Sequence, residues 1–180
     1  MASYIQVGIC TDVIIHKADL ARARITRDEA VQNLTSDFLD PSMFIAHEDA
    51  DELRWALPRE LVETGLVPFL RAQYALLGHH APRDFEATLS RIAGAGGYEG
   101  IVALAKARSI PELWVGRLGD FLSVGPARSE LPVHTEVLIY LIEGKAIMEC
   151  YRQLFTYIEA LVHGQRDRFP IAAAVKVFVE

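Results

Sequence analysis

About fifty residues at the C-terminal end constrain the fold more than any other part of this 180-residue chain. An apolar run at 133–142 leads into the turn Glu143-Gly144-Lys145, an amphipathic segment extends to His163, and a second apolar run follows at 172–179. Two short apolar runs joined by a segment of helical period are typical of a strand–helix–strand unit. This part of the chain therefore predicts a sheet with the connecting helix packed against it.

The first apolar segment, 4–16, predicts another strand because it is rich in Ile and Val. Apolar residues are consecutive at 13–15, which indicates a central strand that is covered on both faces. Thr26 and Glu29 have the spacing of a capping box and predict that a helix begins there. Together these elements predict an α/β (or α+β) fold in a single domain, 1–180, with one mixed β-sheet and helices packed against it.

Composition and charge exclude several classes of function. The chain has 24 acidic and 18 basic residues, and the whole excess lies in residues 1–90, which hold 14 acidic and 8 basic residues. Nucleic acid is not an expected partner, because neutralising phosphates requires clustered Lys and Arg. The longest apolar runs are about ten residues, whereas a membrane-spanning helix needs about 20. Cys10 and Cys150 form no CxxC motif, so we expect buried thiols, with one disulfide between them as the alternative, Cys150 near the core, and a cytoplasmic location.

Two glycine-containing motifs fail as nucleotide-binding loops. In the cluster 94–100, the third glycine position of a dinucleotide fingerprint is occupied by Glu99. In Gly144-Lys145-Ala146, an alanine stands where a P-loop has its Mg²⁺-binding hydroxyl group. We found neither a metal-ligand spacing nor a GxSxG motif. The sequence thus predicts no cofactor and no metal site, and it favours a non-enzymatic protein.

An acidic run is the most promising functional feature. Glu48, Asp49, Asp51 and Glu52 place four carboxylates within five positions, and Trp55 follows shortly after them. Such a run is often a solvated helix start or loop. It also suits a surface that attracts a basic partner by its charge, with Trp55 as an anchor. We interpret these five residues as a candidate protein-binding site.

A second set of residues supports a different interpretation. Asp12 and His16 lie four residues apart in the first predicted strand, and His134 and Glu136 lie on one face of a later strand. Carboxylates within apolar strands need partners, and such groups can mark a site, although a bulge or an exposed edge explains them equally well. The alternative function is therefore a small-molecule-binding protein or enzyme with a pocket at the carboxyl edge of the sheet. A structural homo-oligomer is a third alternative.

Two segments carry a family resemblance, Leu66-Val67-Pro68-Phe69-Leu70 and Glu143-Gly144-Lys145-Ala146-Ile147-Met148-Glu149-Cys150-Tyr151. They resemble small bacterial proteins of the polymorphic-toxin immunity type. The resemblance implies a cytoplasmic, non-enzymatic protein that neutralises a toxin by binding it, and it assigns no individual residue a role. Combined with the acidic run, it makes an immunity-type inhibitor of a basic toxin the leading interpretation.

Overall fold

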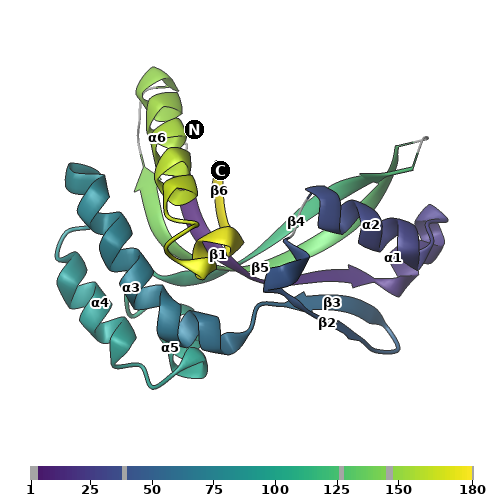
Figure 1. The fold of residues 1–180 in the computed structure, drawn as a ribbon, viewed down its shortest axis with the longest axis horizontal. Helices are drawn as coiled ribbons and strands as arrows, with labels where there is room; N and C mark the ends of the chain where they lie inside the picture. The colour runs from purple at the N-terminus through teal and green to yellow at the C-terminus, as the bar shows by residue number, and fades with distance from the viewer. Residues whose placement is uncertain (1–3, 38–39, 126–127, 145–147, 180) are drawn as a thin grey trace. The chain divides into compact units, whose positions relative to one another are not determined.

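The computed structural model describes residues 4–37, 40–125, 128–144 and 148–179, which form a six-stranded antiparallel sheet with helices packed against it (Figure 1). The strands are β1 (Tyr4–His16), β2 (Ile45–Glu48), β3 (Glu52–Ala56), β4 (Trp114–Val124), β5 (Ser129–Gly144) and β6 (Val175–Val179). The helices are α1 (Lys17–Ala23), α2 (Arg27–Asp37), α3 (Arg59–Leu77), α4 (Phe85–Ala93), α5 (Tyr98–Lys106) and α6 (Met148–Gly164). Short 3-10 helices are η1 (Pro41–Met43), η2 (Gly78–His80) and η3 (Pro170–Ala174).

Strand β1 is the centre of the sheet. The strand order is β2-β3-β1-β5-β4, and β6 also pairs with β1. Residues 5–9 of β1 pair with β6, and residues 12–16 pair with β3. Its side chains are buried from residue 5 to residue 13, as expected for a strand with apolar residues on both faces. The prediction of a central first strand is confirmed.

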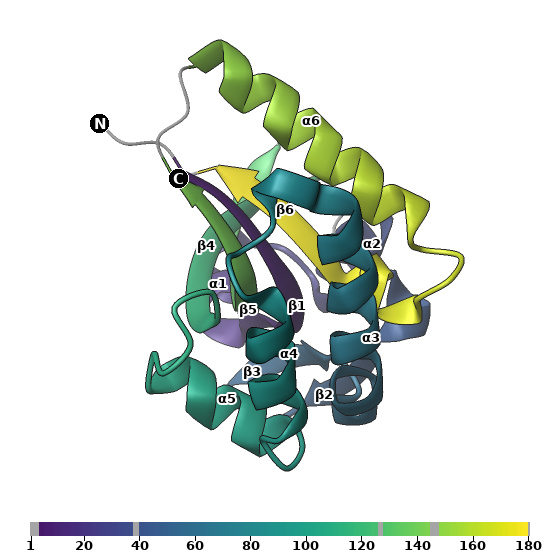
Figure 2. The same cartoon turned by 90° about the vertical axis from the view of Figure 1, so that its left-hand side faces the viewer.

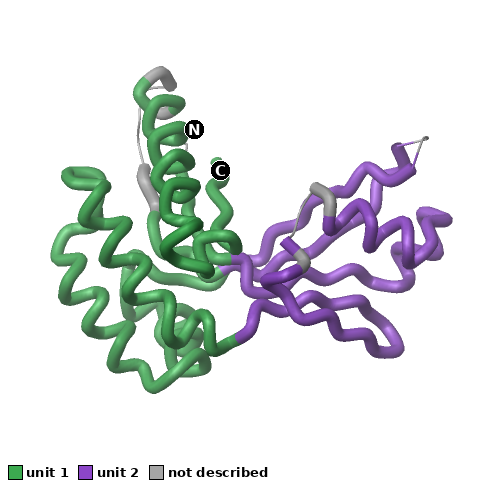
Figure 3. The backbone as a smooth tube through the Cα atoms, viewed as in Figure 1, with its two compact units in different colours: residues 1–9, 59–116, 138–180 green, residues 10–58, 117–137 purple. Residues whose placement is uncertain are grey.

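The chain divides into two compact units, coloured separately in Figure 3. Unit 1 comprises residues 1–9, 59–116 and 138–180. Unit 2 comprises residues 10–58 and 117–137. Strands β1, β4 and β5 each contribute residues to both units.

Helix α3 organises the core of unit 1, because it packs against α4, α5, α6 and η3. Its buried side chains include Leu66, Phe69 and Tyr74, and the Tyr74 hydroxyl group donates to the carbonyl oxygen of Tyr140 at 2.8 Å. Pro68 lies inside this helix, which continues on both sides of it. Helix α6 runs beside β6, as Figure 2 shows.

The core of unit 2 is formed by alternate positions of its strands and by the apolar sides of its first two helices. The buried side chains include Val13, Ile15, Leu53 and Trp55 from the strands and Leu20, Ile25, Ala30 and Leu34 from the helical segments. The predicted capping box is confirmed at the start of α2. The Thr26 backbone N–H donates to the Glu29 carboxylate at 2.8 Å, and the Glu29 N–H donates to the Thr26 hydroxyl oxygen at 3.3 Å.

The predicted α/β class is confirmed, with one sheet, helices packed against it and the C-terminal strand–helix–strand unit β5-α6-β6. The sheet is antiparallel, whereas we expected a mixed one. Strands β5 and β6 are not neighbours, because β1 lies between them and pairs with both. Lys145 of the expected turn, and Ala146 of the rejected P-loop motif, lie outside the described residues.

Candidate functional site

The acidic run forms the turn of a β-hairpin. Strands β2 and β3 pair with Glu48 opposite Leu53, and the Asp49 carboxylate accepts hydrogen bonds from the N–H groups of Asp51 and Glu52 at 2.8 and 2.9 Å. These bonds to the charged form lower the pKa of Asp49, the one from Asp51 most. We had expected a loop or helix start, so β3 was missed. Its signal in the sequence was the alternation of charged and apolar residues at 52–55, which matches the buried and half-buried positions of the strand.

Glu48 fixes this hairpin to the two helices of unit 2. Its carboxylate oxygens lie 2.9 Å from Lys17 Nζ and 3.0 Å from Arg27 Nε. The hydrogen bond from Lys17, and then that from Arg27, lower the pKa of Glu48. The Lys17 backbone N–H also donates to the Asp51 carbonyl oxygen at 2.8 Å. The acidic run is therefore held in one conformation, with Glu48 neutralised from within the unit.

Trp55 does not serve as the exposed anchor that we expected. It is 7% exposed and lies on the core face of β3, two residues from the buried Leu53. Successive side chains of a strand point to opposite faces, so Trp55 shares the buried face and Arg54 the other. The large apolar side chains that unit 2 does expose include Ile45, at 51%, and Phe121, at 62%.

The alternative site residues lie in unit 2, on the sheet face opposite the core. Asp12 is fully buried, and its Oδ1 accepts from Arg54 Nε at 2.8 Å and from Nη2 at 2.6 Å. The β1–β3 register places Ile14 opposite Arg54 and His16 opposite Glu52, so these side chains share a face with Asp12. Bonding to the Asp12 carboxylate raises the pKa of the Arg54 guanidinium.

The other two residues extend this face onto β5. The rings of His16 and His134 lie 5.2 Å apart between centroids. Glu136 Oε1 is 2.9 Å from Arg117 Nη2, and its backbone oxygen accepts from the Thr11 hydroxyl group at 3.2 Å. The structure therefore brings His16 to His134, and it joins Asp12 and Glu136 each to an arginine that the sequence analysis did not select.

The carboxylates on this face already have charged partners within unit 2. Both carboxylates are engaged by guanidinium groups, and Asp12 is shielded from solvent. Within the described ranges, His, Cys, Asp and Glu side chains form no group of three or more that could hold a metal ion. The missed arginines had one signal in the sequence: a carboxylate in an apolar strand, Asp12, requires a cation.

Two further observations concern the cysteines and the helices. Cys10 is buried and Cys150 is exposed, and the two form no disulfide with each other. The expected near-core position of Cys150 is wrong, because this residue lies in the first turn of α6. In the part of the chain that the structure describes, the helices are all too short or too polar to span a bilayer.

The described geometry therefore offers two surfaces in unit 2. One is the acidic end of the β2-β3 hairpin, and the other is the sheet face that carries Asp12, His16, His134 and Glu136. Comparisons with family models, curated proteins and solved structures give no match to this chain.

Proposed function

We propose that this chain is a non-enzymatic protein-binding module and that the acidic unit 2 binds a basic protein. The observation that carries the proposal is the distribution of charge between the units. Unit 2 holds thirteen acidic and seven basic residues, so its net charge is −6, the same as that of the whole chain. Unit 1 holds eleven acidic and eleven basic residues. A unit with this imbalance attracts basic partners over distance and repels acidic ones.

The acidic surface that we propose for binding consists of Asp28, Glu29, Glu48, Asp49, Asp51 and Glu52. The ion pair between Arg27 and Glu48 joins the first turn of α2 to the hairpin, so residues far apart in sequence form one surface. The Asp28 side chain is 94% exposed, and Asp51 is also exposed. A surface whose hydrogen bonds are already formed loses little conformational entropy on binding.

The specific form of this proposal is an immunity-type inhibitor of a basic toxin in the cytoplasm. It follows from the family resemblance of segments 66–70 and 143–151 together with the charge of unit 2. Such an inhibitor needs affinity and rapid association more than it needs a reactive group. Complementary charge supplies the rapid association.

Amide variants test the proposal with little disturbance of the fold. The substitutions Asp28→Asn, Asp49→Asn, Asp51→Asn and Glu52→Gln remove four charges, and the amide that replaces the Asp49 carboxylate keeps an oxygen to accept the turn hydrogen bonds. The matched control removes four exposed carboxylates from unit 1, namely Glu60, Asp84, Glu99 and Asp167.

The partner is captured from the native host with the wild-type chain, identified by mass spectrometry and then titrated against each variant. We expect a basic protein whose association rate falls roughly tenfold or more with the unit 2 variant and with added salt. The unit 1 control should bind as the wild type does. Equal loss in both variants, or binding that ignores salt, would contradict the proposal.

A further inference from the structure

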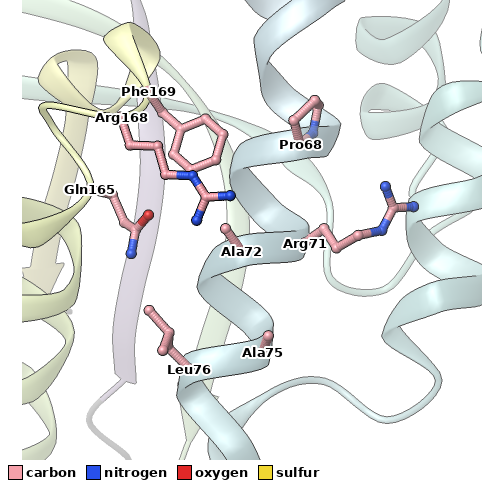
Figure 4. Close-up of a pocket in the computed structure, with 8 residues that line it drawn as sticks. All are labelled: Pro68, Arg71, Ala72, Ala75, Leu76, Gln165, Arg168 and Phe169. Atoms are coloured by element: carbon pink, nitrogen blue, oxygen red, sulfur yellow. The ribbon is translucent and has the colours of Figure 1, made fainter.

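We propose that unit 1 carries a binding site for a small amphiphilic anion, a molecule with one acidic group on an apolar body. The site is a pocket of about 490 Å³ between α3 and the segment that follows α6 (Figure 4). Its volume lies within the range of about 300–1,000 Å³ that is usual for small-molecule sites. The inference goes beyond the proposed function, because it concerns a different unit and a different class of ligand.

The apolar part of the pocket comes from α3. Small side chains at Ala72 and Ala75 leave the space open, and Leu76 is 48% exposed beside them. Opposite them, Phe169 packs edge-on against the core residue Phe69, with ring centroids 5.9 Å apart. An apolar surface that is fixed on both sides suits an acyl chain or one or two rings.

The polar part comes from Gln165 and Arg168. Figure 4 shows the Arg168 guanidinium and the Gln165 amide directed toward α3 from the same side. The Arg168 guanidinium carbon lies 5.1 Å from the Phe169 ring centroid, which restrains its head group. Gln165 uses its backbone oxygen to accept from the N–H groups of Arg168 and Phe169, so its side-chain amide is not needed for that turn. Two donors on the same side of an apolar surface suit a carboxylate, sulfonate or phosphate group.

The charge at this pocket favours an anion. Arg71 also lines it, but its head group extends to the other side of α3, where it lies 3.4 Å from the Glu86 carboxylate. Arg168 forms no ion pair with any described residue, and the residues that line the pocket include no carboxylate. Of the two arginines that line the pocket, Arg168 therefore faces it and has no carboxylate among the described residues to compensate its charge.

The test uses anilinonaphthalene sulfonate, a fluorescent anion with an apolar body, and the neutral N-phenylnaphthylamine as its matched analogue. We expect saturable binding of one sulfonate probe per chain and roughly tenfold or weaker binding of the neutral analogue. Arg168→Gln should weaken sulfonate binding by roughly tenfold or more. Arg166→Gln is the matched control, since it removes the same charge from an exposed neighbour outside the pocket, and it should leave binding unchanged.

A filling variant and competitors complete the design. Ala72→Leu should abolish binding of both probes while thermal unfolding shows that the fold is retained, because it occupies the pocket without changing the charge. Free decanoate should displace the sulfonate probe. Displacement by phosphatidylglycerol vesicles but not by decanoate would assign the surface to lipid headgroups and overturn the proposal. So would equal effects of Arg166→Gln and Arg168→Gln, or a signal that does not saturate.

Discussion

Replacing Arg54 should destabilise the fold more than replacing Asp12, although both changes break the same ion pair. Asp12 is fully buried, whereas the Arg54 side chain is 36% exposed. In Asp12→Asn, water can reach the guanidinium that is left, and we expect a loss of about 1–2 kcal/mol in the free energy of unfolding. In Arg54→Met, a carboxylate remains in the interior without its guanidinium, which costs about 3–5 kcal/mol.

The double variant Asp12→Asn/Arg54→Met provides a second sign of the same cause. It removes both the carboxylate and the guanidinium, so neither charge of this pair remains. Its loss in the free energy of unfolding should therefore be smaller than that of Arg54→Met alone.

Urea unfolding followed by tryptophan fluorescence measures these differences, since Trp55 lies beside Arg54 in β3. The four chains, wild type, two single variants and the double variant, form a double-mutant cycle. Two results would refute the reasoning: a larger loss for Asp12→Asn than for Arg54→Met, or losses that simply add in the double variant.

Three other predictions rest on single contacts. Gly100→Ala should cost roughly 1–3 kcal/mol in urea unfolding, because the new Cβ would overlap the backbone oxygen of Ala95. This cost should outweigh the better helix propensity of alanine. Gly119→Ala is the control, since its new Cβ meets open space and should be tolerated. Tyr140→Phe should cost about 1–3 kcal/mol in the same assay, because its hydroxyl group donates to a buried glutamine at 2.6 Å. The pKa of Glu48 is lowered from 4.5, so the stability from this carboxylate is present above that value and is lost as the pH falls through the folded pKa. Acid unfolding of Glu48→Gln should depend less steeply on pH than that of the wild type.

The sequence predicted the elements whose signal is local. The bounds of β1 and the capping box of α2 followed from apolar runs and from a four-residue pattern. The hairpin β2-β3 was missed because its strands have four and five residues and the carboxylates between them dominate the composition. Charge density indicates solvent exposure, and it does not reveal that a carboxylate such as Asp49 is closing a turn.

The candidate sites depended on contacts that no local pattern contains. Asp12 and Arg54 are 42 positions apart, and Glu48 is 31 positions from Lys17, so neither pair is visible before the strands are placed in register. Trp55 was assigned to the surface because of its acidic neighbours. Its burial follows from strand alternation, which could be applied only after β3 was recognised.

The acidic surface of unit 2 is not explained by the acidic composition of the chain alone. Carboxylates brought together repel one another, and this self-repulsion opposes folding. The two helix cations that reach the hairpin, Lys17 and Arg27, both pair with Glu48 and hold the hairpin in place. Arg27 also lies 3.5 Å from Asp28, but the Asp28 side chain stays 94% exposed, and Asp51 is exposed as well. A fold that needed only solubility could spread these charges over both units, but unit 1 is balanced. A fixed hairpin with exposed carboxylates beside it favours a role in which this surface binds another molecule.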